Sequence, residues 1–317
     1  MKSIFSSILL TVFCLSASGQ DQAMRPFADY ERTGYLIMAA AAGHDSSAQK
    51  RTIVQNLPSD VKLILFAPKL DQAKQELIIS DYARFIPRSR IIYMTIPKGE
   101  RGFWARDAVP FPLIGSGGNL ILADAHYWDN FEPDDYFSQL FQAPMIKHKK
   151  TFEGGNFMTN HLGNCFMVNS TPTDQISNSF FVKNYGCRTV TKLPHVGGIG
   201  HIDERARFID EKTILTDTES YRKVFEKQGY TVHMLPKGKK AMETYVNSII
   251  VNGTVFVPTF MHANDEVALN VYRSVGLKVI GLDSRALSNT GKGSYHCITM
   301  NFPAVPLGQV SPSFVVQ

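Results

Sequence analysis

The segment Gly197-Gly198-Ile199-Gly200-His201-Ile202-Asp203-Glu204 is the point from which the fold of this chain can be inferred. Its glycines are followed by two side chains that can act as acid, base or ligand, His201 and Asp203. In a β-strand, residues i and i+2 project from the same face, so a strand here presents both side chains together. Glycines beside them allow a tight backbone and the close approach of a ligand.

Comparable polar residues recur on both sides of His201 at a nearly constant interval. Asp107 and Glu153 precede it and Asn247 and Cys297 follow it, at successive spacings of 46, 48, 46 and 50 residues. Each lies in an apolar, strand-like stretch. A fixed period in this range indicates a repeat architecture in which every copy is one supersecondary unit. If the units close into a ring, the five side chains face a common pocket.

Short apolar runs between these positions define the repeated unit. In one copy, the apolar run 213–215 is followed by a helix-permissive segment, 220–228, and by a second apolar run, 232–235. A third run then carries the polar residue at or near its start. Short β-rich runs bounded by Gly, Pro and Asn are typical of strands, and the longer spans suit helices. We predict an α/β protein with five strand–helix–strand–strand units, the first of them stretched by an extra run at 91–94. Such units can bury their apolar faces against each other without exposed sheet edges.

Composition and charge restrict the class of protein. The 317 residues are 44% hydrophobic and 19% charged, as is typical of a globular protein. The formal net charge of +5 is small for this size, and no basic stripe alternates with aromatic residues. We therefore expect no nucleic-acid binding. The basic clusters at 147–150 and 237–240 are interpreted as solvated loops.

Residues 1–19 are interpreted as a secretory signal peptide. Lys2 precedes the apolar run 4–15, and small residues follow at 16–19, a pattern that indicates export rather than a membrane span. We predict that residues 20–317 form one domain, secreted or periplasmic and without membrane insertion. No feature of the sequence indicates an oligomeric state.

The predicted mature chain contains three cysteines, Cys165, Cys187 and Cys297. An odd number in an oxidising compartment leaves at least one thiol free or paired between chains. Cys165 and Cys187 can form a disulfide, or both can be buried small hydrophobes. In either case Cys297 is the candidate for a free thiol.

The residue types at the repeated positions suit a flat cation. Trp104, three residues before Asp107, offers an apolar face beside an anion, which suits a guanidinium group. Each motif also has an ordinary structural explanation: a core Trp, an exposed Glu153 at a glycine turn, a hydrogen-bonded core Asn247, or an inert buried Cys297. The shared period favours a common site.

A zinc site is a further alternative for His201 and Asp203. Zinc needs at least one more well-placed ligand, for which Cys297 or Asp107 is available. Acidic groups outnumber the ligand types that zinc prefers, so we predict no metal.

The chain resembles the agmatine deiminase and Porphyromonas-type peptidylarginine deiminase family, within the guanidino-group-modifying (pentein) superfamily. The motifs that carry the resemblance are Trp104-Ala105-Arg106-Asp107, Glu153-Gly154-Gly155-Asn156, Gly200-His201-Ile202-Asp203, Tyr245-Val246-Asn247 and His296-Cys297-Ile298-Thr299. They stand in the family's order across essentially the whole mature chain. The resemblance implies a five-bladed α/β propeller, which agrees with the period, and a reaction without cofactor.

The resemblance also implies four catalytic roles. Cys297 is the expected nucleophile, because a sulfur anion is the side chain most able to attack a guanidinium carbon near neutral pH. Asp107 and Asp203 grip the guanidinium edges through paired hydrogen bonds. His201 protonates the departing ammonia and then activates the water that hydrolyses the thiouronium intermediate.

Three further residues are expected to bind substrate. Trp104 stacks on the planar group or its aliphatic stem, Asn247 orients the cysteine or the substrate, and Glu153 lines the pocket.

We predict a hydrolase acting on the C–N bond of an amidine, which converts peptidyl-arginine to peptidyl-citrulline and ammonia. The peptide substrate is preferred because family members that act on agmatine are typically intracellular, whereas this chain carries an export signal. The alternatives are an agmatine deiminase that produces N-carbamoylputrescine, an enzyme that transfers the amidino group to an amine, and a non-catalytic binding propeller. The last is disfavoured because every expected reactive position holds a competent residue.

Overall fold

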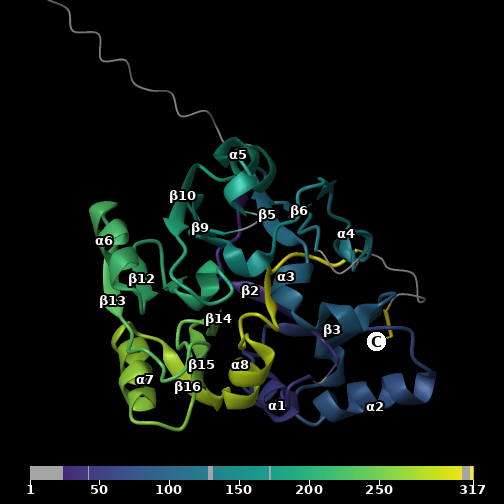
Figure 1. The fold of residues 1–317 in the computed structure, drawn as a ribbon. Coiled ribbons are helices and arrows are strands. Elements are labelled where there is room, and N and C mark those ends of the chain that lie inside the picture. Colours follow the sequence, from purple (N-terminus) through teal and green to yellow (C-terminus); the bar gives the residue numbers. More distant parts are fainter. Residues whose placement is uncertain (1–23, 42, 128–130, 171–172, 309–314, 317) are drawn as a thin grey trace, which may run out of the picture.

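The structure, a computed structural model, describes residues 24–41, 43–127, 131–170, 173–308 and 315–316. The predicted signal peptide lies outside these ranges. The described strands form five separate sheets with helices packed beside them (Figure 1). Within the described residues no strand pairing joins one sheet to the next, so there is no closed sheet. The α/β class is confirmed, whereas the five-bladed propeller and the single domain over 20–317 stay predictions.

Three of the sheets follow one pattern. The middle strand pairs antiparallel with the strand before it and parallel with the strand that follows the helix. The elements are β8 (Met158–Thr159), β9 (Asn164–Asn169), α5 (Asn178–Tyr185) and β10 (Thr189–Pro194); β11 (Ala206–Phe208), β12 (Thr213–Thr216), α6 (Glu219–Lys227) and β13 (Thr231–Met234); and β14 (Ile249–Val251), β15 (Thr254–Thr259), α7 (Asn264–Ser274) and β16 (Lys278–Asp283).

The fourth sheet repeats the pattern and adds one strand from the N-terminal segment. Its elements are β5 (Phe111–Gly115), β6 (Leu120–Ala123), α4 (Asp134–Phe141) and β7 (Met145–Ile146), with β1 (Met24–Pro26) antiparallel to β5. The recurrence of strand, strand, helix and strand confirms the repeated unit that the apolar runs predict.

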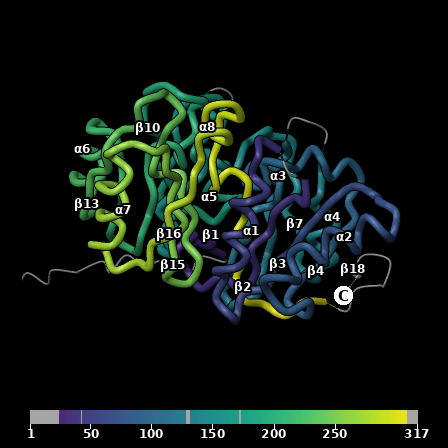
Figure 2. Tube along the Cα trace, turned by 90° about the horizontal axis from the view of Figure 1, so that it is seen from below, coloured from purple at the N-terminus to yellow at the C-terminus, as the bar shows by residue number. Residues whose placement is uncertain are grey.

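The fifth sheet joins the two ends of the described chain. Its elements are β2 (Thr33–Ala39), α1 (Ser47–Gln55), β3 (Lys62–Ala67), α2 (Gln72–Ala83) and β4 (Ile91–Thr95), with β17 (Met300–Pro303) antiparallel to β2 and β18 (Val315–Val316) antiparallel to β4. Figure 2 shows the yellow C-terminal chain running beside β2. This sheet is the stretched first copy, and β4 is its predicted extra strand.

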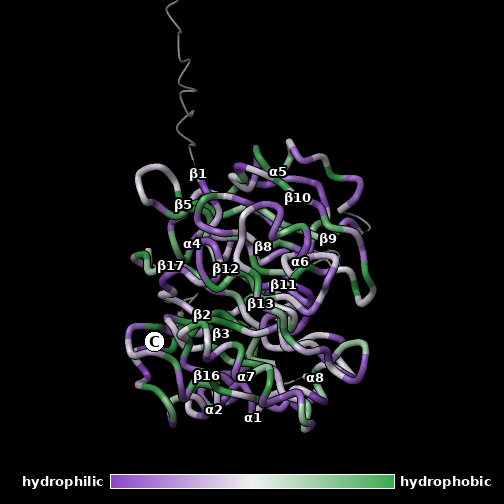
Figure 3. The backbone as a smooth tube through the Cα atoms, turned by 90° about the vertical axis from the view of Figure 1, so that its left-hand side faces the viewer, coloured by the Kyte–Doolittle hydropathy of each residue, from purple (hydrophilic) through white to green (hydrophobic). Residues whose placement is uncertain are grey.

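The strand β2 separates two hydrophobic cores. Successive side chains of a strand point to opposite faces, and here Tyr35, Ile37 and Ala39 join one core while Leu36 and Met38 join the other. All residues of β2 are buried, as expected for a strand covered on both faces. The green colour of β2 and β3 in Figure 3 reflects this composition.

The five periodic polar residues do not lie in strands, which corrects the prediction. Asp107 belongs to the one-turn helix α3 (Ala105–Ala108), while Glu153 and His201 directly precede the 3-10 helices η3 (Gly154–Asn156) and η5 (Ile202–Glu204). Asn247 and Cys297 lie in turns ahead of β14 and β17. The i and i+2 argument for His201 and Asp203 therefore does not apply, although both side chains do reach one site.

Backbone hydrogen bonds explain why turns form at these positions. The N–H groups of Asp107, Asn156 and Thr299 donate to carbonyls three residues earlier, at 3.0, 3.0 and 3.1 Å. Each such bond closes a tight turn before the chain becomes extended. A turn projects consecutive side chains in several directions, whereas a strand alternates between only two.

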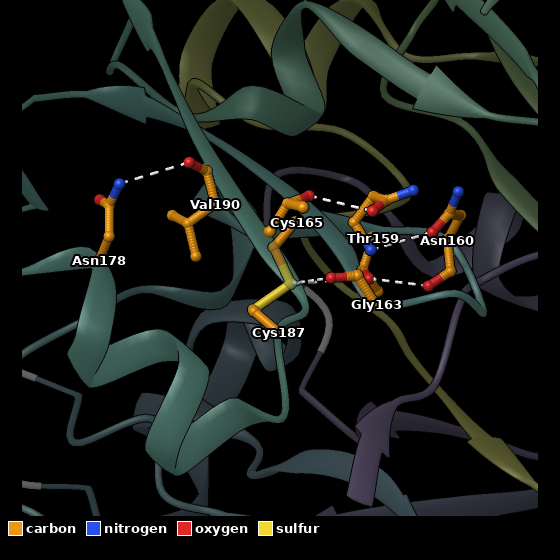
Figure 4. Close-up of a disulfide and its surroundings, with 9 residues drawn as sticks. Thr159, Asn160, Gly163, Cys165, Asn178, Cys187 and Val190 are labelled. Atoms are coloured by element: carbon orange, nitrogen blue, oxygen red, sulfur yellow. Dashed lines mark hydrogen bonds between the residues drawn. A yellow bond between two sulfur atoms is a disulfide. The ribbon is translucent and has the colours of Figure 1, made fainter. Parts of the chain in front are cut away.

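Cys165 and Cys187 form a disulfide that links β9 to the chain after α5 (Figure 4). Their Cα atoms are 5.8 Å apart, and both residues are fully buried. Cys297 is buried and free, as the odd number of cysteines predicts. Among the described helices, none combines the length and the apolar character that crossing a bilayer requires.

Removing this disulfide is expected to destabilise the fold. Replacement of Cys165 and Cys187 by Ala should lower the free energy of unfolding by about 3 kcal/mol, because the bridge closes a loop with a sequence separation of 22 residues. Urea unfolding measures the difference. A reductant should shift the midpoint of the wild type and leave that of the double variant unchanged; equal wild-type midpoints with and without reductant would contradict the prediction.

Candidate active site

Three of the predicted site residues converge on Gly155. An ideal Cβ placed on Gly155 lies 2.5 Å from His201 Nδ1, 2.9 Å from Asp107 Oδ1 and 3.1 Å from Asp203 Oδ2. Contacts below 3.0 Å exclude a side chain here, so only glycine leaves the space that these groups share. Residues from three different turns therefore meet at one point.

Glu153 holds the His201 ring. Its Oε2 lies 2.8 Å from His201 Nε2, while His201 Nδ1 lies 3.8 Å from Asp107 Oδ1. The backbone N–H of Gly155 donates to the same Asp107 oxygen at 2.8 Å. Glu153 therefore contacts the imidazole directly, which is a more specific position than the pocket-lining one predicted for it.

Asn247 holds the Cys297 turn and its sulfur. Its Nδ2 donates to Cys297 Sγ at 3.2 Å, and its Oδ1 accepts from the backbone N–H groups of His296 and Cys297 at 3.1 and 3.4 Å. The sulfur also lies 3.6 Å from Asp203 Oδ2. The thiol and the Asp203 carboxylate thus share one buried pocket with Asp107 and His201.

Trp104 lies in the wall beside this cluster. Its ring stacks on His44 with the centroids 5.8 Å apart, and meets Phe103 edge-on at 4.9 Å. An ideal Cβ on Gly293 would lie 2.4 Å from Trp104 Cζ3, so the loop before Cys297 packs directly on the indole. These contacts support a packing role, and stacking of Trp104 on the substrate stays a prediction.

Several charged residues at the site carry no predicted role. They are Asp29, Arg106, Arg207 and His296, which form an ion-pair network behind Asp203; Asp29 is partly exposed and the other three are buried. Two of them could have been found from the sequence, because Arg106 and His296 lie inside the motifs, next to Asp107 and Cys297. Asp29 and Arg207 lie outside those motifs, and their proximity depends on the fold.

Burial and mutual repulsion set the protonation of the acidic groups. Burial, assisted by Glu153 and Asp203, raises the pKa of Asp107 to about 7, although His201 opposes the rise. Burial also favours a higher pKa for Asp203, but the hydrogen bond from His296 and nearby cations outweigh it, so that this pKa is lowered. The two carboxylates therefore differ in charge at neutral pH.

Burial and the neighbouring acidic groups also shift the pKa values of the histidine and the thiol. Burial favours a lower pKa for His201, but Asp107 and the hydrogen bond to Glu153 outweigh it and raise the pKa to about 10. Burial, Asp203 and Asp107 raise the pKa of Cys297 well above its usual value. The pocket thus holds a protonated imidazole and a protonated thiol, and a bound cation would favour the thiolate.

Two polar atoms in this pocket, Asp203 Oδ1 and His201 Nδ1, are buried without a hydrogen-bond partner among the described residues. Buried polar atoms are nearly always paired in folded proteins, so unpaired ones need an explanation. An acceptor oxygen next to a second carboxylate fits a ligand that carries several N–H donors.

The zinc alternative finds no support in this geometry. Within the part of the chain that the structure describes, no group of three or more His, Cys, Asp or Glu side chains has the arrangement of a metal site.

Comparisons with known proteins agree with the predicted resemblance. A family model described as Porphyromonas-type peptidyl-arginine deiminase matches residues 224–303, which include Asn247 and Cys297. A Streptomyces coelicolor protein, provisionally named an agmatine deiminase, is 24% identical over 256 residues, which cover 63% of this chain and 75% of the relative.

Two solved structures share the fold over nearly their whole length. The agmatine deiminase of C. jejuni matches with a TM-score of 0.71 and 21% identity, covering 88% of this chain and 95% of that one. A provisionally named arginine deiminase from Porphyromonas gingivalis matches with a TM-score of 0.71 and 21% identity, covering 92% and 100%. The predicted resemblance is confirmed, and the enzyme class that it implies, a hydrolase acting on C–N bonds of amidines, agrees with the names of these relatives.

Replacing Asn247 by Ala is expected to make the Cys297 thiol less acidic. The variant loses the donor that lies 3.2 Å from the sulfur, and losing one such bond to a thiolate shifts its pKa by roughly one unit. Alkylation by iodoacetamide, followed against pH, should be about tenfold slower. Asn289→Ala, which removes an amide bonded to Glu243, is the control, and an unchanged rate in Asn247→Ala would refute the role.

Proposed function

We propose that this chain hydrolyses the guanidino group of agmatine to N-carbamoylputrescine and ammonia through a covalent Cys297 intermediate. The observation that carries the proposal is the pocket around Gly155, where a thiol, two carboxylates and an imidazole meet and Asp203 Oδ1 is unpaired. That arrangement complements a flat cation with N–H groups on its edges.

Substrate binding changes the charge state of the pocket. A guanidinium between Asp107 and Asp203 supplies the positive charge that the two buried acids lack, so Asp107 ionises and the thiol loses its proton to solvent. Paired hydrogen bonds to the two carboxylates hold the guanidinium carbon against the sulfur. The nucleophile is therefore activated only when a cation is bound.

The reaction then proceeds in two steps. The Cys297 thiolate forms a C–S bond to the guanidinium carbon, and the C–N bond breaks as protonated His201 transfers its proton to the departing ammonia. His201, now neutral, takes a proton from water, whose oxygen attacks the thiouronium carbon. The C–S bond breaks, the hydroxyl proton passes to sulfur, and the ureido product leaves. Glu153 keeps the His201 ring in place throughout.

Agmatine is preferred because the similar proteins are mostly named as agmatine deiminases. Arginine in peptides is the second candidate, favoured by the description of the family model over residues 224–303 and by the predicted export signal. We further propose that the five sheets are the blades of a propeller around the pocket, and that the mature protein is exported.

Substitution of Cys297 by Ser should abolish the reaction. Purified wild type is incubated separately with agmatine, free arginine and an arginyl peptide, and both ammonia and ureido groups are measured. We expect fastest turnover of agmatine by the wild type and no product from Cys297→Ser, because a hydroxyl is far harder to ionise than a thiol.

The outcomes of this experiment separate the candidates. Faster conversion of the peptide would favour the peptidyl-arginine reaction over the agmatine reaction. Ammonia from the Ser variant at the wild-type rate would sink the mechanism. An absence of product from wild type with all three substrates would leave no case for a deiminase.

The pH dependence should report the ionisation of Asp107. Because Asp107 must be a carboxylate to bind a guanidinium and its pKa in the free pocket is raised to about 7, kcat/KM should fall tenfold per pH unit below about pH 7. A bound cation lowers that pKa, so kcat should decline only at lower pH. A kcat/KM that stays constant between about pH 5 and 8 would rule out this role.

A further inference from the structure

His296, the residue before the nucleophile, lies between two carboxylates. Its Nδ1 is 2.7 Å from Asp203 Oδ2, and its Nε2 is 2.7 Å from Asp29 Oδ2. The side chains of His296 and Asp203 are each 2% exposed. Because Asp203 Oδ2 is also 3.6 Å from Cys297 Sγ, the chain of contacts leads from the sulfur to Asp29.

The two short contacts determine how many protons this group holds. A neutral imidazole has one N–H, and an ionised carboxylate can only accept. Contacts of 2.7 Å on both ring nitrogens are therefore satisfied together when both nitrogens carry a proton, which makes His296 an imidazolium between two carboxylates. Burial and the cations Arg106 and Arg207 favour a lower pKa for His296, and Asp29 and Asp203 oppose them. The two 2.7 Å contacts favour the doubly protonated ring, because a neutral ring would leave one carboxylate oxygen facing a nitrogen without a proton.

Asp29 is anchored to the turns that carry the site. Its two oxygens accept from Arg106 Nη1 at 3.1 Å and from Arg207 Nη1 at 3.2 Å. The backbone N–H of Arg106 donates to the Cys297 carbonyl at 3.0 Å, and Arg207 Nε donates to the carbonyl of Val246, next to Asn247, at 3.0 Å. Because both oxygens of Asp29 are paired, this network fixes its members in one arrangement.

We propose that His296, held by Asp29, is a positioning residue that keeps Asp203 ionised, with Oδ2 beside the thiol and Oδ1 free for the substrate. This inference rests on the proposed deimination, in which Asp203 must be an anion to bind the guanidinium. His296 itself does not touch the reacting atoms. It acts through the carboxylate, which would otherwise take up a proton because of its burial.

Other charged groups also face His296 and Asp203 and influence the pKa values of both. Asp203 is influenced by His201, Arg207, Asp107, Glu204 and Cys297, and His296 by Arg106, Arg207 and Asp29. Of the described groups that face Asp203, none makes a hydrogen bond to its carboxylate as short as the 2.7 Å contact of His296. Loss of His296 should therefore change the pKa of Asp203 more than that of Asp107.

Two substitutions at position 296 separate the two contacts. His296→Asn keeps a neutral donor at the Nδ1 position, facing Asp203, whereas His296→Gln places its donor near the Nε2 position, facing Asp29. Removing the cation should raise the Asp203 pKa by about one to three units, so kcat/KM should fall by about 10- to 1,000-fold at acid pH below the raised pKa, more in His296→Gln. Asp29→Asn, which removes a charge and keeps an acceptor, should act in the same direction with a smaller effect.

The measurement that tests this role is the slope of log kcat/KM against pH at acid pH. In the wild type, log kcat/KM should follow the single proton of Asp107; in His296→Gln, it should follow two protons, because Asp203 now titrates in the same range. His148→Asn, which removes a half-buried histidine bonded to Tyr185, should leave the profile unchanged. A single-proton profile in His296→Gln would overturn the inference even if its activity were low.

A second measurement is independent of turnover. The ring 15N resonances of His296 in wild type, assigned by difference from His296→Asn, should show a doubly protonated ring at pH 7, and a single neutral tautomer would overturn the inference. If the wild type converts no guanidino substrate, the proposed function fails, while these resonances still decide the protonation of His296. If turnover is normal and the ring is neutral, the proposed function stands and the positioning role fails.

Discussion

Two buried carboxylates and a thiol share the space around Gly155, and the rest of the site is arranged around this concentration of acidic groups. Burial disfavours every ionised form, so the Cys297 thiol keeps its proton and Asp107 has a pKa of about 7. Only Asp203 is held as an anion, by its hydrogen bond to His296. The Asp203 carboxylate therefore lacks a cationic donor at Oδ1, which is unpaired among the described residues. In the proposed reaction, a guanidinium supplies both the charge and the N–H donors, so that its binding also activates the sulfur.

The fold delivers these groups through turns rather than through strands. Asp107, Glu153 and His201 each stand at a short helical turn ahead of the first strand of a sheet. A strand in the same place would send successive side chains to only two opposite faces, whereas a turn projects them in several directions. The turn lets Glu153 contact His201 while the Gly155 backbone binds Asp107.

The two ends of the described chain meet near Cys297. The turn with Cys297 leads directly into β17, which pairs with β2 near the N-terminus. Asp29, only a few residues before β2, reaches behind the site to His296 and to both arginines. The position of the sulfur thus depends on the closure of the whole fold, since the residues that fix it lie up to 267 positions apart.

The sequence by itself determined the repeated unit, the resemblance to the deiminases, the free Cys297 and the set Asp107, Glu153, His201, Asp203, Asn247 and Cys297. These follow from local patterns: a period, short motifs and an odd number of cysteines. Only the tertiary structure decided that Cys165 and Cys187 pair, that Glu153 holds His201, that Trp104 packs under the loop at Gly293, and that Asp29 joins His296. Each of these depends on the distance between segments far apart in the chain. Spacing along a sequence identifies which residues are equivalent, but the hydrogen bonds and charges between them arise only when the sheets pack together.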